Sequence, residues 1–248
     1  MKISLCDFHT HLHQYDIKDP SLKEIKNSNI LTIAASMDIP SYIKTKEMKE
    51  DLNTPLIIPT FGIHPSLSHI PFNKEEALIY MKESPLIGEI GLDYLWAKNV
   101  PKYKQEEVFR FFLDFCNKNN KYCIIHTKDA EQDVVDILND YPNARPIIHW
   151  YDGPIEIFKE IVKRGYYCTF GCEVKYSSHI RKLLSMLPQD KLLTETDNPE
   201  SEVWLGGKKH NPLLIEDVVL DIAKALNKEK EEINNIVLNN SQTILANL

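Results

Sequence analysis

The sequence contains no glycine-rich phosphate loop after any predicted strand, and this absence argues against a doubly wound, open sheet. No apolar run is long enough to span a bilayer, and no signal peptide is visible, so we expect a soluble cytoplasmic protein without a membrane partner. The five cysteines are odd in number and form no C-x-x-C pair. We therefore expect buried thiols in a reducing compartment, with a redox or metal pair of Cys168 and Cys172 as the alternative.

An excess of basic residues is also missing. The chain has 29 lysines and arginines against 36 acidic residues, which gives a net charge of -7. This balance excludes a passive DNA-coating protein, because non-specific affinity for nucleic acid comes from basic surface. It does not exclude an enzyme whose phosphate contacts are a few lysines and bound metal cations.

Short apolar runs alternate with amphipathic helical patterns along the whole chain, and no linker, charge block or repeat interrupts them. This alternation predicts an α/β protein whose parallel strands close into a TIM (β/α)8 barrel, as a single domain over residues 1–248. The strands are expected at Ile3–Phe8, Ile30–Ala35, Leu56–Phe61, Leu86–Ile90, Tyr122–Ile125, Arg145–Ile148, Tyr166–Phe170 and Leu192–Thr194. The helices are expected to include Lys104–Lys118, Pro154–Arg164, Leu213–Leu226 and Lys230–Leu245.

Two histidines follow the first predicted strand, and a carboxylate follows the last one. His9 and His11 are two residues apart, so in an extended chain both imidazoles point to the same side. Asp197 ends a Glu-Thr-Asp segment, in which Glu195 could orient a ligand. Because catalytic groups of barrels gather where strands end, these positions favour an amidohydrolase-like metal site at the C-terminal face. The alternatives are ordinary core or surface histidines and a simple turn at Asn198-Pro199.

Three more ligand-type residues occupy strand ends in the middle of the chain. Glu89 lies in an apolar strand, where an unpaired carboxylate is expensive to bury. It therefore either forms an internal salt bridge with a lysine or bridges two cations, and Gly88 and Gly91 leave room for a close approach. His126 and His149 follow successive strands. Either one alone would be interpreted as a core histidine, but packing does not readily explain two in the same relative position.

Further residues are expected to face the substrate at the same mouth. Lys128 can place a point charge on a phosphate, and His64 can contact that phosphate or an additional cation. Asp93 is expected beside the substrate, where it could also hold a histidine or a water. Some aromatic residues of the mouth loops could stack on bases, with loop packing as the alternative. They are Trp96, Trp150, Tyr151 and Trp204.

Taken together, these motifs make the chain resemble the TatD family of metal-dependent hydrolases, a deoxyribonuclease family, from residue 7 to the C-terminal helices. The motifs are Asp7-Phe8-His9-Thr10-His11, Gly62-Ile63-His64-Pro65, Gly88-Glu89-Ile90-Gly91-Leu92-Asp93-Tyr94, His126-Thr127-Lys128-Asp129-Ala130, His149 with Gly153, and Glu195-Thr196-Asp197-Asn198-Pro199. The resemblance implies a TIM barrel, a binuclear divalent-metal centre and phosphodiester hydrolysis. It assigns metal binding to His9, His11, Glu89, His126, His149 and Asp197.

The chain departs from the family pattern at three places, all of them in substrate-facing loops. Lys128 stands where the family usually has arginine, so a bidentate phosphate clamp becomes a single-point contact. After His149 the family usually reads aromatic-Ser-Gly, whereas here the sequence is Trp150-Tyr151-Asp152-Gly153. The usual aromatic-Leu pair after Pro199 is replaced by Glu200-Ser201. The expected metal ligands are complete, and the changes bear on the substrate.

We therefore expect an exonuclease-like deoxyribonuclease with two divalent cations, Mg²⁺, Mn²⁺ or Zn²⁺, in which a metal-bound hydroxide attacks phosphorus. His9, His11 and Asp197 would hold one cation, His126 and His149 the other, and Glu89 would bridge them. Asp197 would orient or deprotonate the water, and Glu89 and Lys128 complete the expected catalytic residues. We expect a monomer acting on DNA, with RNA or tRNA as further candidates. The alternatives are hydrolysis of another ester or amide, such as an aminoacyl-tRNA bond, and a non-catalytic partner subunit.

Overall fold

The computed structural model of the protein describes residues 2–199, 201, 205–206 and 211–247, and within them strands and helices alternate along the chain. The described residues fall into two compact units, which are described in turn. The first unit comprises residues 2–34 and 44–58 with the described part of 168–247, and the second comprises residues 35–43 and 59–167.

Parallel pairs of short buried strands form the centre of the first unit. β1 (Leu5–Thr10) pairs in parallel with β2 (Ile30–Ala35), and β7 (Tyr167–Phe170) pairs in parallel with β8 (Leu192–Thr194). β8 also lies against β1, where the Thr194 hydroxyl donates a 2.6 Å hydrogen bond to the backbone oxygen of Cys6. All residues of these strands are buried, which explains why apolar residues on β2 and β8 do not alternate with polar ones. β1 also buries the polar residues Asp7, His9 and Thr10.

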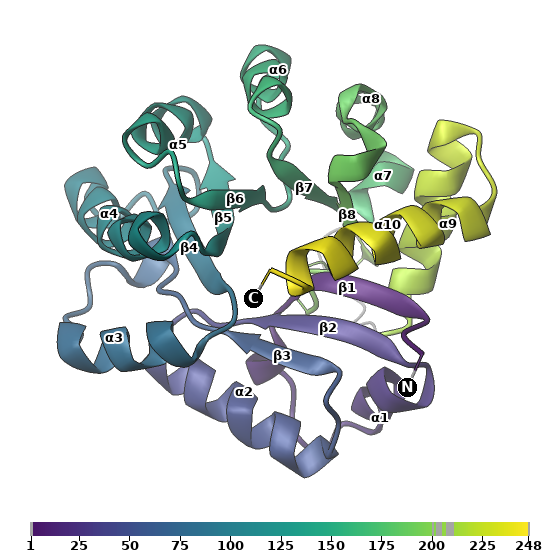
Figure 1. The fold of residues 1–248 in the computed structure, drawn as a ribbon, viewed down its shortest axis with the longest axis horizontal. Helices are drawn as coiled ribbons and strands as arrows, with labels where there is room; N and C mark the ends of the chain where they lie inside the picture. The colour runs from purple at the N-terminus through teal and green to yellow at the C-terminus, as the bar shows by residue number, and fades with distance from the viewer. Residues whose placement is uncertain (1, 200, 202–204, 207–210, 248) are drawn as a thin grey trace. The chain divides into compact units, whose positions relative to one another are not determined.

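Two long C-terminal helices cover the strands of the first unit. The longer, α10 (Lys230–Leu245), packs on β1 and β8 and against α9 (Leu214–Leu226) (Figure 1). Ile233, Val237 and Ile244 form its buried stripe, at the spacing that an amphipathic helix requires. The other helices with residues in this unit are α1 (Lys23–Asn27), α2 (Ile39–Leu52), α7 (Glu173–Tyr176) and α8 (Ser178–Met186), with 3₁₀ turns at Leu12–Gln14, Pro20–Leu22 and Gln189–Lys191.

The second unit is centred on β5 (Tyr122–Lys128), which pairs in parallel with β4 (Ile87–Asp93) and β6 (Arg145–Ile148). The last residues of β3 (Ile57–Thr60) also belong to it. β4 and β5 each continue three residues beyond the predicted ends, so the polar residues that were expected to follow these strands lie inside them. The strands continue because their backbones stay paired up to Asp93 and Lys128, and this pairing does not depend on whether the side chains are polar.

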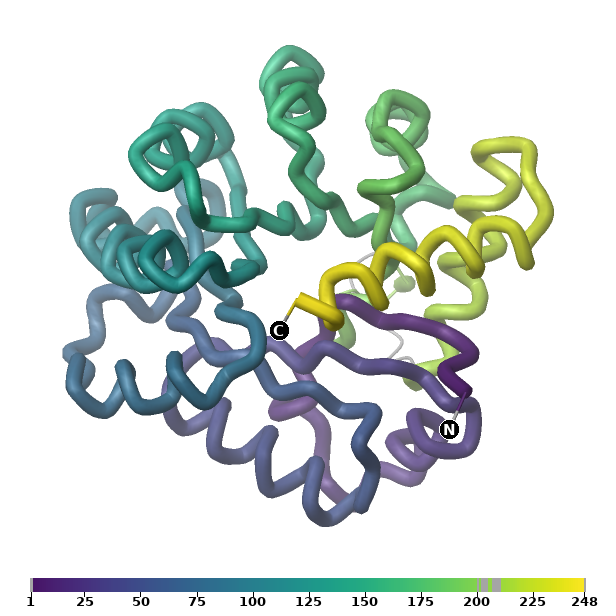
Figure 2. Tube along the Cα trace, in the orientation of Figure 1, coloured from purple at the N-terminus to yellow at the C-terminus, as the bar shows by residue number. Residues whose placement is uncertain are grey.

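Helices follow the strands of the second unit. They are α3 (Lys74–Glu83), α4 (Lys102–Asn119), α5 (Glu131–Ile137) and α6 (Ile155–Lys163), with 3₁₀ turns at Pro65–Leu67 and Leu138–Asp140. The apolar residues Val108, Phe109 and Phe112 of α4 are buried, and α4 packs on β4. α4 is capped by Asn120, which has φ 51°, and β5 begins two residues later. The course of the chain can be followed by colour in Figure 2. Asparagine is one of the few residues that tolerate this left-handed cap.

All five cysteines are buried and free, as the sequence predicts. Burial raises the pKa of the Cys6 thiol to about 12, so this thiol stays protonated and inert. No disulfide joins Cys168 to Cys172, and a redox or metal pair of these two thiols stays a prediction. Among the described helices, none is both long and apolar enough to cross a lipid bilayer.

Candidate metal centre

Three predicted ligands converge in the first unit. His9 lies in β1, His11 directly follows that strand, and Asp197 lies three residues after β8. The Nε2 atoms of His9 and His11 are 3.3 Å apart, and Asp197 Oδ1 lies 3.3 Å from the first and 3.4 Å from the second. Burial would raise the pKa of Asp197, but the imidazoles of His11 and His9 hold that pKa well below its usual range, which keeps the carboxylate charged.

The backbone after β8 is fastened to the end of β1, and this brings the ligands of the first unit together. The Asp197 N–H donates to the His9 backbone oxygen at 2.9 Å, and the His11 N–H donates to the Asn198 oxygen at 2.8 Å. The Thr10 hydroxyl donates to the same Asn198 oxygen at 3.0 Å. The predicted turn at Asn198-Pro199 is therefore part of the scaffold that holds Asp197, rather than an alternative to a ligand role.

Asp7 is a positioning residue of this unit for which sequence reasoning assigned no role. Its carboxylate accepts hydrogen bonds from the Thr196 N–H at 2.9 Å and the Thr196 hydroxyl at 2.7 Å. Burial raises the pKa of Asp7 to about 8, even though these hydrogen bonds act to lower it. The available signal was an aspartate two residues before His9 in an apolar strand. Glu195, which was expected to orient a ligand, lies with a carboxylate oxygen within 4.8 Å of a His9 ring nitrogen.

A second set of predicted ligands converges in the second unit. Glu89 Oε1 lies 2.8 Å from His126 Nδ1 and 2.9 Å from His149 Nε2, and the two imidazole nitrogens are 3.4 Å apart. All three side chains are buried. Within the second unit, the partners of Glu89 therefore include two histidines.

Glu89 is placed by an irregularity of its strand. The pairing of β4 with β5 shifts by one residue between Ile87 and Ile90, as in a β-bulge, which turns a side chain away from strict alternation. Gly91 lets the strands approach closely, because a Cβ there would lie 2.0 Å from the His126 backbone oxygen. A Cβ on Gly62 would lie 2.3 Å from the Glu89 oxygen. Neither position accepts a side chain without moving a ligand.

Asp93 contacts the far side of the His126 ring. Its Oδ2 lies 3.1 Å from His126 Nε2, while Oδ1 accepts the backbone N–H groups of Leu95, Trp96 and Ala97. Burial would raise the pKa of Asp93, but these contacts, that with His126 foremost, lower it to about 2. The charged carboxylate thus orients the imidazole and leaves Nδ1 directed at Glu89. The role of Asp93 beside a substrate stays a prediction.

His64 and Lys128, the predicted phosphate contacts, are both buried in the second unit. The His64 ring centroid is 4.6 Å from that of His126, and His64 Nε2 lies 3.8 Å from Glu89 Oε1. The Lys128 ammonium donates to Asp152 Oδ1 at 2.8 Å and to the Trp150 backbone oxygen at 2.9 Å. Its charge is therefore shared with Asp152, a partner that the sequence did not suggest.

Both sets have the composition and spacing that a divalent cation needs. Ligand atoms at about 2.0–2.2 Å from a cation are roughly 3.3–3.6 Å apart in a tetrahedral site and roughly 2.8–3.1 Å apart at neighbouring positions of an octahedral site. The three atoms of the first unit are 3.3–3.4 Å apart, and those of the second are 2.8–3.4 Å apart. Two imidazoles and one carboxylate in each set suit Zn²⁺, Mn²⁺ or Fe²⁺. Burial would lower the pKa of His126, yet Asp93 and Glu89 raise it, and the same carboxylates would stabilise a bound cation.

The predicted stacking residues differ in exposure. Trp150 and Tyr151 are buried and therefore pack within the protein, as the alternative interpretation held. Trp96 is 65% exposed. Trp204 and Glu200 lie outside the described residues.

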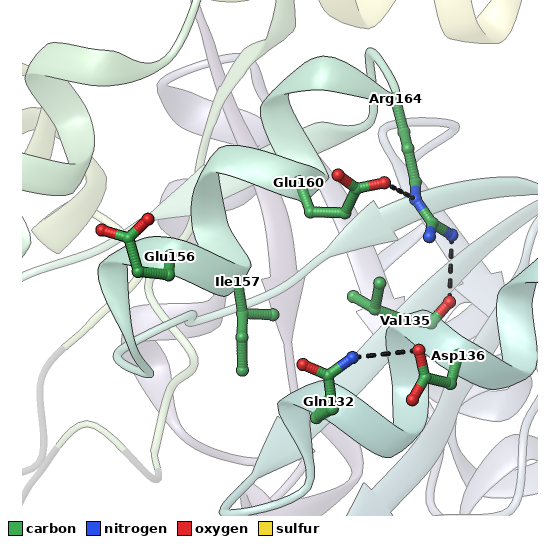
Figure 3. A pocket seen from close by; sticks show the side chains of 7 residues that line it. All are labelled: Gln132, Val135, Asp136, Glu156, Ile157, Glu160 and Arg164. Carbon is green, nitrogen blue, oxygen red and sulfur yellow. Dashed lines mark hydrogen bonds and ion pairs between the residues drawn. The ribbon is translucent and has the colours of Figure 1, made fainter.

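A groove of 380 Å³ lies between α5 and α6 (Figure 3). It is bordered by an ion pair, in which Arg164 donates to Glu160 at 3.0 Å, and the same guanidinium donates to the Val135 backbone oxygen at 2.9 Å. None of the described lining residues is a predicted ligand, so this groove is separate from the candidate metal centre.

Comparisons with known proteins agree with the chemistry of these ligands. Residues 6–246 match the family described as TatD related DNase. An uncharacterized metal-dependent hydrolase of Methanocaldococcus jannaschii is 28% identical over 96% of this chain and 96% of its own length. The metal-dependent hydrolase YabD of Bacillus subtilis is 32% identical over 97% of this chain and 98% of its own. The solved structure of YjjV, a TatD homologue from Escherichia coli, matches with a TM-score of 0.85 at 19% identity and covers 98% of each chain.

The structural match confirms the predicted fold class, the TIM-barrel fold of the TatD proteins. The family match spans almost all of the sequence and includes both sets of ligands. This chain therefore belongs to the TatD related DNase family of metal-dependent hydrolases.

Proposed function

We propose that the protein is an exonuclease-like deoxyribonuclease that hydrolyses phosphodiester bonds with two divalent cations, as a monomer in the cytoplasm. The observation that supports this most is the convergence of two imidazoles and a carboxylate within 3.4 Å in each unit. A scaffold protein has no need of such costly buried groups. The description of the matched family supports DNA as the polymer.

Bound divalent cations would supply Lewis acidity, which neutralises charge on the phosphate oxygens and makes water easier to deprotonate. The side chains have separate tasks around them. Asp197 would accept a proton from the attacking water, and Glu89 would contribute the negative charge that a bound cation needs. His64 and the remaining ammonium N–H of Lys128 hold the phosphate. Asp93 keeps the imidazole of His126 in the orientation that a metal ligand needs.

A second candidate is hydrolysis of an uncharged ester or amide, such as an aminoacyl-tRNA bond. The ion pair of Lys128 with Asp152, at 2.8 Å, favours it, because this pair reduces the positive charge available to a phosphate. The family's usual arginine has five N–H donors and could bind Asp152 and a phosphate at once. A lysine has only three.

One set of assays separates these functions. Purified protein, loaded in turn with Mg²⁺, Mn²⁺ and Zn²⁺, is given single-stranded and duplex DNA labelled at the 5′ or the 3′ end. Matched RNA, aminoacyl-tRNA and a simple carboxylic ester are assayed beside it. We expect stepwise shortening of DNA from one end. Turnover of the ester or aminoacyl-tRNA without cleavage of DNA would favour the second candidate, and inactivity on all substrates with a full metal content would favour a non-catalytic partner subunit.

A further inference from the structure

A further carboxylate lies near the Lys128–Asp152 ion pair of the second unit. Glu131 is the first residue of α5 and is only 7% exposed. Burial raises its pKa, and the charges of Asp152 and Asp129 raise it further. The ammonium of Lys128 acts in the opposite direction. Burying a carboxylate beside two like charges costs free energy, so this position indicates a specific task for Glu131.

Glu131 holds the turn that follows Lys128. Its Oε1 accepts the backbone N–H of Asp129 at 3.1 Å. Asp129 has φ 50°, in the left-handed region, which is uncommon for a residue with a side chain and needs support from its surroundings. Because Asp129 directly follows the lysine, the direction in which the Lys128 side chain leaves the end of β5 depends on this support.

The loop between β6 and α6 leaves space for the same carboxyl group. A Cβ on Gly153 would lie 2.6 Å from Glu131 Cγ and 2.9 Å from Oε1. The φ of Gly153 is outside the left-handed region, so it is lack of space that excludes a side chain here. Lys128 reaches this loop as well, at the Trp150 backbone oxygen and at Asp152. The two loops therefore interlock through Glu131 and Lys128.

We infer that Glu131 is a positioning residue for Lys128 and sets how firmly this lysine holds a substrate phosphate. The inference rests on the proposed nuclease function and adds to it a residue that controls substrate affinity. The Lys128 ammonium has three donors, and two of them bind Asp152 and Trp150, so its direction decides whether the third reaches a phosphate. A relaxed turn would misdirect that donor without removing any candidate metal ligand.

The test measures cleavage of DNA at steady state and, by calorimetry, binding of inorganic phosphate to the Mg²⁺-loaded protein. Glu131→Ala removes the acceptor of the Asp129 N–H, whereas Glu131→Gln keeps an oxygen in its place. Asp133→Ala is the matched control, because it removes an exposed carboxylate from the first turn of the same helix, one that binds the Tyr94 hydroxyl instead. Each change is also made together with Lys128→Ala.

We expect Glu131→Ala to raise the KM for DNA and the Kd for phosphate by about 2- to 10-fold, as for coupled members of one charge network, with kcat within about twofold of the parent. Glu131→Gln should bind at least as tightly as the parent, since it keeps the acceptor and removes a negative charge beside the ammonium. Asp133→Ala should match the parent. In the Lys128→Ala background neither Glu131 substitution should change these constants, because Glu131 acts through the lysine.

Unchanged constants in Glu131→Ala, an equal rise with and without Lys128, or no rescue by Glu131→Gln would each overturn the inference. If Glu131→Ala does not fold, Gly153→Ala takes its place, since the added methyl group displaces the Glu131 carboxyl group and should raise the same constants. A parent that cleaves no DNA would refute the nuclease alone, because the Kd for phosphate still tests the role of Glu131.

Discussion

Replacing Asp93 by asparagine would test whether this carboxylate sets the orientation and tautomer of His126. In the parent, Asp93 Oδ2 lies 3.1 Å from Nε2 of the ring, and a charged carboxylate there favours a proton on Nε2, which would leave the lone pair of Nδ1 to a bound cation. An asparagine amide group in the same place would donate to Nε2 instead. The proton would then move to Nδ1, where a metal ligand needs a lone pair.

The magnitude follows from the two ways in which the substituted asparagine could respond. With its amide group toward His126 it favours the wrong tautomer, and outer-shell changes of this kind weaken metal binding or activity by about 10- to 100-fold. With the amide group flipped, it faces the three N–H groups of residues 95–97, and leaving such buried donors without an acceptor costs roughly 1–3 kcal/mol. Either response is penalised, so we expect at least a tenfold loss.

The loss should appear in metal affinity, measured by competition with a fluorescent chelator, and not only in turnover. Asp133→Asn is the matched control, because the exposed Asp133 also accepts a hydrogen bond, from the Tyr94 hydroxyl at 2.8 Å, but contacts no predicted ligand. Thermal unfolding of the metal-free variants would show whether the substitution destabilises residues 95–97, whose N–H groups bind Asp93, or acts only through His126. Metal affinity of Asp93→Asn within threefold of the parent would refute the orienting role.

Three further predictions concern charges at the site. Glu89→Gln nearly preserves size but removes the charge, and we expect elemental analysis to show loss of at least one cation with an unchanged circular dichroism spectrum; two bound cations would contradict the bridging role. Asp197→Asn should lower turnover by about two to four orders of magnitude, as expected for a general base, and a variant within tenfold of the parent would mean that Asp197 is not the proton acceptor. Asp152→Asn should release the Lys128 ammonium and lower the KM for DNA by roughly two- to fivefold, the scale of one partly exposed ion pair, while Lys128→Ala should raise it. If neither changes this KM, Lys128 does not bind phosphate.

The convergence of the candidate ligands could be predicted because strand order and strand ends are visible in the sequence. Apolar runs locate the strands, and a histidine or carboxylate at the end of such a run has few packing roles. This is how His126 and His149 were singled out, and the structure places one ring nitrogen of each 3.4 Å apart, with Glu89 Oε1 within 2.9 Å of both. The strand ends were predicted less accurately, because β4 and β5 include polar residues that were expected to follow them.

The positioning residues could not be predicted in the same way. Asp7 acts on Thr196, which is 189 positions away in the sequence, and neither residue type points to the other. Asp152 is the partner of Lys128 only because the segment after β6 returns to the end of β5. Such contacts depend on where the backbone passes, and no periodicity of the sequence reports that.

Periodicity also fails to predict the direction in which the candidate ligand side chains point. Period-two alternation assumes regular pairing, yet β1 and β4 each hold one extra residue at a ligand. In β1 the extra residue lies between Asp7 and Thr10, around His9, and in β4 it lies between Ile87 and Ile90, around Glu89. A bulge re-aims the side chain at that position and shifts the alternation beyond it. The directions of the His9 and Glu89 side chains are therefore set by local backbone irregularity. This explains why the sequence could single out these two residues as candidate ligands but could not predict their geometry.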